Sequence, residues 1–177
     1  MKKQGFTLIE LMVVIVIMGI LAAVAVPKLF GMIAKSKASE VGPAAGTYVK
    51  LQDAYAAEAG AVGSWVNIGY IGPGTKGTGD NAGKKSNTNV FDYADELTGT
   101  TEGSIMIGNL KTAKKGWSAK NKTALNDCPI QSEWNIQVVG GDASNGSTVS
   151  YTSNVPAKVD NVDKCGSLTA NFANIGK

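Results

Sequence analysis

The sequence lacks histidine altogether, has only two cysteines, and carries few charged residues in its first thirty positions. Histidine is the commonest general base and metal ligand, so its absence argues against an enzyme. Aromatic residues make up 7% of the chain, which is enough for one modest core. The 17 basic and 14 acidic residues form no long basic run, which argues against a dedicated nucleic-acid site.

No nucleophile–base pair, metal cluster or phosphate-binding loop can be assembled from the sequence. Gly72–Gly77 fits the spacing G-x-G-x-x-G, but a turn sequence follows it where a dinucleotide site needs a helix. We therefore predict that the chain is not an enzyme and uses no cofactor or metal. Most of the 22 glycines lie after residue 59, which predicts a turn-rich, mostly β C-terminal region.

The N-terminal segment is long and apolar. Between Phe6 and Lys28 the only charged residue is Glu10, and Lys2 and Lys3 precede the segment. About twenty apolar helical residues, each rising 1.5 Å, cross a hydrocarbon core of about 30 Å. The segment is therefore a membrane-spanning candidate, and its basic residues favour an N-terminus on the cytoplasmic side.

Two simple interpretations of this segment leave Glu10 unexplained. A secretory signal would end at a small-residue cleavage site such as Ala22–Ala25, and it has no use for a carboxylate in its apolar core. A plain membrane anchor has no use for it either, because a carboxylate costs about 2.5–3.5 kcal/mol in a membrane helix and usually has a partner.

A third interpretation rests on the sequence Gly5-Phe6-Thr7-Leu8-Ile9-Glu10. It resembles the processing motif of type IV prepilins and of the related pseudopilins of type II secretion. The resemblance implies that a prepilin peptidase cleaves between Gly5 and Phe6, that Phe6 is then N-methylated, and that Glu10 and Thr7 act in assembly.

The resemblance also gives Glu10 a partner. The amine freed at Phe6 of an incoming subunit would pair with Glu10 of a neighbour already in the filament. Two charges about 4 Å apart attract by roughly 4 kcal/mol at an effective dielectric of 20, and such a pair fixes register more than it adds stability. Gly19 and Pro27 match helix-softening positions of the family; the stretch between them either melts in the filament or is merely kinked.

Beyond the membrane segment, apolar residues recur every three or four positions from Ala34 to Val62. This spacing predicts one helix from Phe6 to Ala59, about 80 Å long, whose second half is amphipathic and docks on a globular domain. Pro27 and Gly42-Pro43 interrupt the pattern and predict kinks.

The remaining residues predict an α+β pilin fold, in which the long helix packs on an antiparallel sheet. Residues 91–97 are expected to form a short helix or irregular cover, and residues 140–146 the turn of a hairpin. The three tryptophans are expected in the core or at subunit contacts: Trp65, Trp117 and Trp134. The strand candidates are Ser104–Leu110, Glu133–Val139, Thr148–Ser153 and Leu168–Phe172.

The two cysteines, Cys128 and Cys165, are expected to form one disulfide, because paired cysteines in an exported chain usually do; two unrelated buried thiols are the alternative. The resemblance agrees, since the family has a C-terminal disulfide. Residues 160–163 offer three oxygen-bearing side chains that could hold calcium, as in many major pseudopilins, but such a loop is more often simply solvated.

These observations divide the chain into a leader (1–5), a transmembrane and polymerisation helix (6–30), the amphipathic half of that helix (31–59), a Gly-rich connecting loop (60–103) and a sheet with a disulfide-bounded C-terminal region (104–177). By resemblance, the chain is a major type IV pilin. It would be held in the inner membrane with the assembly machinery, then polymerise as an extracellular filament for adhesion, motility or DNA uptake. A type II secretion pseudopilin is the alternative, and an anchored binding domain that never polymerises is a third.

Overall fold

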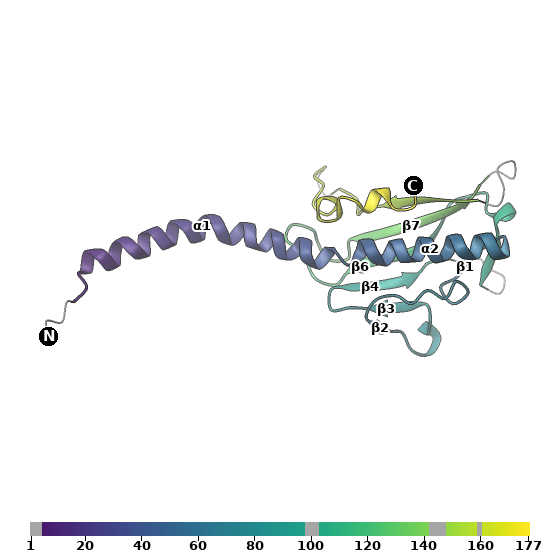
Figure 1. Ribbon diagram of the computed structural model, residues 1–177, viewed down its shortest axis with the longest axis horizontal. Coiled ribbons are helices and arrows are strands. Elements are labelled where there is room, and N and C mark those ends of the chain that lie inside the picture. The colour runs from purple at the N-terminus through teal and green to yellow at the C-terminus, as the bar shows by residue number, and fades with distance from the viewer. Residues whose placement is uncertain (1–4, 98–102, 142–147, 159–160) are drawn as a thin grey trace.

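The first third of the chain is helical. The computed structural model describes residues 5–97, 103–141, 148–158 and 161–177. Helix α1 covers Leu8–Ala38 and helix α2 covers Val41–Ala59, and the two run almost in line, with α1 projecting away from the rest of the structure (Figure 1). The predicted helix is therefore present but is divided in two.

The division falls at Ser39 and Glu40, just before the predicted break at Gly42-Pro43. Proline has no N–H, so Pro43 cannot donate the helical hydrogen bond to the carbonyl of Ser39. The Ser39 N–H instead donates to the Ser36 carbonyl at 3.3 Å, and its hydroxyl donates to the same oxygen at 2.6 Å. Pro27, by contrast, lies inside α1 without ending it.

A six-stranded antiparallel sheet packs against α2, which confirms the predicted α+β pilin fold. The strand order is β2-β3-β4-β6-β7-β8, so β6 and β4 are central and β2 and β8 are the edges (Figure 1). The strands are β2 (Thr75–Lys76), β3 (Lys85–Asn87), β4 (Phe91–Asp95), β6 (Lys114–Asn121), β7 (Glu133–Gly140) and β8 (Val149–Asn154).

Several predicted elements differ from the structure. Residues 91–97 were expected as helix or irregular cover, but Phe91 and Tyr93 point inward and Asp92 outward, the alternation of strand β4. The expected strand Leu168–Phe172 is instead two 3₁₀ turns, Gly166–Thr169 and Phe172–Asn174. The expected hairpin turn lies mostly outside the described residues.

The strand expected at Ser104–Leu110 is shorter than predicted and is not part of the main sheet. Only Ser104–Met106 is extended, as β5, and a 3₁₀ turn follows at Ile107–Asn109. β5 pairs with β1 (Ala61–Gly63) in a separate two-stranded sheet. The segment expected as a connecting loop, 60–103, thus contains β1 to β4, and three of these strands, β2, β3 and β4, are neighbours in the main sheet.

The core lies between α2 and the sheet. The predicted stripe is buried at Ala38, Val41, Ala45 and Tyr48, and all three tryptophans are at most 1% exposed, which confirms their place in the core. Gly116 of β6 leaves room for the Tyr48 hydroxyl, which a methyl group at this position would overlap.

One hydrogen-bond chain ties the helix to the sheet through the core. The Tyr70 hydroxyl donates to the Ala44 carbonyl at 3.1 Å and accepts from the Trp117 indole at 3.1 Å. Burial raises the pKa of Tyr70 to about 12, although the hydrogen bond from Trp117 opposes this shift. These two hydrogen bonds hold Tyr70 against the first turn of α2.

Candidate functional site

The exposed part of α1, up to Ile33, is the most unusual surface of the molecule. Every large apolar side chain from Phe6 to Ile33 is exposed, and the first side chains of this helix to be buried are Ala34 and Ala38. Within the described residues, this is the one helix whose length and apolar composition suit it to cross a membrane. A surface of this kind is stable only in lipid or against other apolar surfaces.

A capping box begins this helix. The Thr7 backbone is extended, with φ −80° and ψ 149°, and its hydroxyl accepts from the Glu10 N–H at 3.3 Å. In return, the Glu10 carboxylate accepts from the Thr7 N–H at 2.9 Å and from the Thr7 hydroxyl at 2.6 Å. These bonds satisfy donors that a helix start leaves without partners, and they place the carboxylate at the positive end of the helix dipole.

The capping box keeps the predicted cleavage bond outside the helix. Gly5 and Phe6 precede the first helical residue, Leu8, and the Phe6 side chain is 88% exposed. A methyl group at Gly5 would meet no atom within 4 Å, so nothing in the fold requires glycine there. Gly19 and Pro27 both lie within α1 and face away from the domain.

The two cysteines form the predicted disulfide. Cys128 and Cys165 are bonded with their Cα atoms 4.8 Å apart, and both are buried. The bridge joins the segment between β6 and β7 to the C-terminal turns, which pack beside the end of α1. The Trp134 indole donates to the Thr169 hydroxyl at 2.8 Å, which holds the same turns to the sheet.

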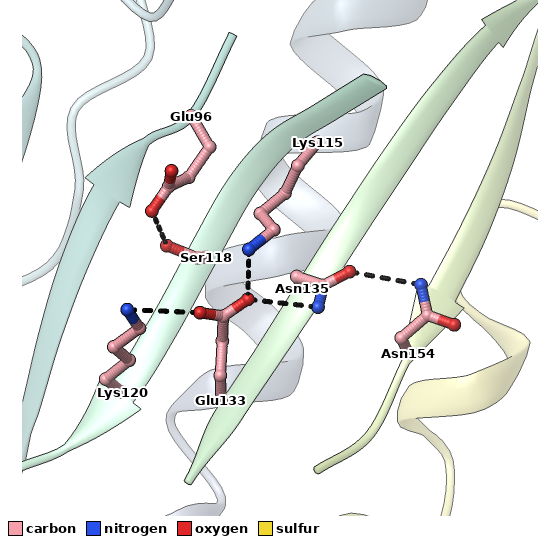
Figure 2. Close-up of polar contacts among 7 residues, drawn as sticks. All are labelled: Glu96, Lys115, Ser118, Lys120, Glu133, Asn135 and Asn154. Carbon is pink, nitrogen blue, oxygen red and sulfur yellow. Dashed lines mark hydrogen bonds and ion pairs between the residues drawn. The ribbon is translucent and has the colours of Figure 1, made fainter. Parts of the chain in front are cut away.

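The sheet face turned away from α2 carries a polar network that joins β6, β7 and β8 (Figure 2). Glu133 forms ion pairs with Lys115 and with Lys120, and its carboxylate also accepts from the Asn135 amide at 3.1 Å. Asn135 in turn accepts from Asn154 of β8 at 3.0 Å. Burial by itself would raise the pKa of Glu133, but the two lysines outweigh it and lower that pKa.

The possible calcium loop is only partly within the described residues. Asp160 lies outside them, and Asp163 is exposed, with its carboxylate accepting from the Gly166 N–H. Among the described residues, no three carboxylate or cysteine side chains gather in a way that could hold a metal ion.

Comparison with known proteins adds to this geometry. A family model described as the prokaryotic N-terminal methylation motif matches residues 1–26. The type IV major pilin PilA of Myxococcus xanthus is 56% identical over 39 residues, which cover 22% of this chain and 18% of that protein. The type IV major fimbrial protein FimA of Dichelobacter nodosus is 56% identical over 39 residues, 22% of this chain and 25% of its own length.

Part of the chain is similar to type IV pilins. A third relative, the fimbrial protein EcpC of Eikenella corrodens, is 54% identical over 44 residues, which cover 25% of this chain and 29% of that protein. The chain spans 18–29% of the length of these curated relatives. The similarity to them covers no more than 25% of this chain, and the family model covers residues 1–26.

Sequence reasoning missed two features of this chain. Thr7 and Glu10 have the T-x-x-E spacing of a capping box, which the sequence itself shows. The network around Glu133 joins residues of three strands, and only the strand register brings them together.

Proposed function

We propose that this chain is the structural subunit of a type IV pilus, which polymerises through its N-terminal helix into an extracellular filament. In this proposal a prepilin peptidase removes residues 1–5, and Phe6 becomes the methylated N-terminus. The subunit waits in the inner membrane, where the assembly machinery collects it. The filament serves adhesion, motility or DNA uptake.

The exposed part of α1, up to Ile33, is the observation that carries the proposal. The domain has a complete core between α2 and the sheet, and this core makes no use of residues 6–33. Each large apolar side chain contributes about 1.5–3 kcal/mol when it is fully buried, so the segment gains tens of kcal/mol on leaving water. Lipid provides this burial before assembly, and the helices of neighbouring copies provide it afterwards.

Glu10 suits this exchange of lipid for protein. The capping box holds its carboxylate at the outer end of the helix, where the Phe6 amine of another copy can reach it. Gly19 and Pro27 give the helix two places at which to adapt its shape as copies pack together, and neither position is constrained by the domain. A role without catalysis also agrees with the names of the relatives, which are pilins and fimbrial proteins.

Mass spectrometry and electron microscopy of sheared cell-surface material test this function. We expect long filaments built of a chain that begins at methylated Phe6. Gly5→Val is the matched variant, because a side chain at Gly5 meets no atom of the fold; it should leave folding intact and abolish cleavage and filaments. A mature chain that begins at Met1 or beyond Ala25 would contradict the proposal. A secretion defect on deletion, without surface filaments, would indicate a pseudopilin instead.

A further inference from the structure

Two loops lie at the end of the domain where α1 leaves it, and the disulfide joins them; we call them the loop rim. The first is the connection between β6 and β7, 122–132, and the second is the segment 161–165 that leads into the C-terminal turns. Figure 1 shows α1 projecting from this end of the sheet. In the first loop, Ala124–Asn126 reach α1 at Phe30 and Ile33, with which they line a cleft of about 180 Å³.

The length of the exposed helix places the loop rim at a membrane surface. Residues 8–33 span about 39 Å at 1.5 Å per residue. A bilayer is about 30 Å thick in its hydrocarbon core and about 40–45 Å thick with its polar layers. In the membrane-inserted subunit proposed above, α1 therefore crosses the bilayer with no exposed helix left over, and a tilt of the helix brings the domain closer still. Because Ala124–Asn126 reach back to Phe30, the loop rim then lies within the headgroup layer.

Two exposed apolar side chains lie beside the disulfide in the loop rim. Ile130 is 60% exposed and Val162 is 55% exposed, and each lies within three residues of a bridged cysteine. Since the disulfide holds the two loops together, these side chains belong to one surface. Protein segments that lie in a membrane interface combine apolar side chains, which leave water, with basic side chains, which stay among the phosphates.

Basic side chains at this end of the molecule are left unpaired by the fold. Within the described residues, no ion pair or side-chain hydrogen bond involves the amines of Lys28, Lys35, Lys37 and Lys164. Lys37 lines the cleft between α1 and the first loop. The nearby carboxylates already have partners: Glu40 accepts from Thr88 and Tyr93, Asp92 pairs with Lys122, Asp127 accepts from Asn126, and Asp163 accepts from Gly166. The unpaired amines are therefore free to bind lipid phosphates.

We propose that the loop rim docks onto the headgroups of anionic phospholipids in the membrane that α1 spans. Lys37 and Lys164 pair with lipid phosphates, and Ile130 and Val162 enter the interface between headgroups and acyl chains. The inference rests on the membrane stage of the proposed function and deepens it, because it fixes how the domain stands on the membrane before assembly. The disulfide keeps both loops in contact with the same lipid surface.

Fluorescence quenching in vesicles tests this docking. The full chain carries a fluorophore on Ala124→Cys, because the native cysteines are buried and already paired. It is reconstituted in phosphatidylcholine, or in an equal mixture of phosphatidylcholine and phosphatidylglycerol, with a trace of lipid that carries a nitroxide on its headgroup. We expect strong quenching in the anionic vesicles and weaker quenching in the neutral ones. The same fluorophore on Met106→Cys should stay unquenched, because Met106 is exposed beyond the other end of α2, about 28 Å along that helix.

Charge variants measure the contribution of the lysines. Lys37→Gln with Lys164→Gln should lower the ratio of docked to undocked domains about twentyfold in the anionic vesicles, because each lysine near an anionic surface strengthens binding about fivefold. Lys50→Gln with Lys111→Gln is the matched control, since both lysines are exposed and lie away from the loop rim. This control should match the wild type, and a control that weakens quenching as much as the first pair would overturn the assignment of Lys37 and Lys164.

The apolar pair provides the second measurement. Ile130→Ser with Val162→Ser should weaken quenching in both kinds of vesicle, whereas Val66→Ser, at a side chain that is 59% exposed elsewhere on the domain, should not. Wild-type chain that floats with the vesicles but shows no quenching, or equal quenching in both membranes, would overturn the docking. So would an Ile130/Val162 variant that loses filaments while its quenching is unchanged, because these side chains would then serve subunit contacts.

Failure of the proposed function gives different results. Wild-type chain that does not float with the vesicles would refute the membrane stage of that function, and the docking with it. Absence of filaments from cells would refute the pilus function and would leave quenching in the vesicles as evidence for the docking.

Discussion

Replacing Glu10 by Gln separates the two roles that the structure and the pilus proposal give to this side chain. Glutamine keeps an oxygen that accepts from the Thr7 N–H and hydroxyl, so the capping box and the helix start should survive. The negative charge is lost, and with it the attraction to the amine of a neighbouring copy. Thr7→Ala is the reciprocal variant, because it weakens the cap but leaves the charge.

The expected sizes of the two effects differ. Two unit charges about 4 Å apart attract by roughly 4 kcal/mol at an effective dielectric of 20, and desolvation offsets part of this. Each 1.4 kcal/mol of net attraction that remains changes the assembly equilibrium tenfold. We therefore expect Glu10→Gln to lower filament yield by about tenfold to a thousandfold. Loss of an N-cap costs about 0.5–2 kcal/mol of helix stability, and a helix in lipid or packed among others tolerates this better.

The assay is the amount of sheared filament per cell, measured beside the amounts of processed and unprocessed subunit in the membrane. We expect Glu10→Gln to be processed and to accumulate as membrane subunit without filaments, Thr7→Ala to assemble at a reduced level, and Thr7→Ser to match the wild type. If Glu10→Gln assembled as well as the wild type while Thr7→Ala failed, Glu10 would serve the helix cap, and the charge-pairing argument would be wrong.

Three further predictions concern the domain. Replacing both Cys128 and Cys165 by serine should lower the free energy of unfolding by about 3–4 kcal/mol, because the disulfide spans 37 positions. Calorimetry should then show a melting temperature lower by about 10 °C, and an unchanged melting temperature would contradict this. Gly116→Ala should destabilise the fold by about 1–3 kcal/mol in urea titrations by crowding the Tyr48 hydroxyl, whereas Gly108→Ala, which faces open space, should be neutral. The pKa of Glu133 is lowered in the folded state from its usual value near 4.5, so its ion pairs stabilise the fold above that pH and are lost as the pH falls through the folded-state pKa. The melting temperature should therefore fall less between pH 7 and pH 3 in Glu133→Gln than in the wild type. An equal fall in both proteins would argue against this.

The strands show where sequence patterns were sufficient and where they were not. β7 and β8 alternate clearly and were predicted to within one residue. β6 was missed although it is central, because Lys114, Lys115 and Gly116 at its start are typical of a loop. Which residues of β6 face the core is known only from the side chains that pack on them in the structure, such as Tyr48 on Gly116.

The helical and apolar character of the N-terminal segment could be predicted from the sequence alone. Its proposed function depends on composition and spacing within about thirty residues: a long apolar run, one carboxylate within it, and a small residue before Phe6. The pairing of Cys128 with Cys165 was likewise expected from the count of two in an exported chain.

The tertiary structure alone decided how distant segments meet. Tyr70 joins Ala44 of α2 to Trp117 of β6, and Trp134 of β7 holds Thr169 of the C-terminal turns. The network at Glu133 likewise depends on strand register. Such contacts are long-range packing outcomes, which no local pattern encodes, because they depend on which surfaces the rest of the chain leaves free.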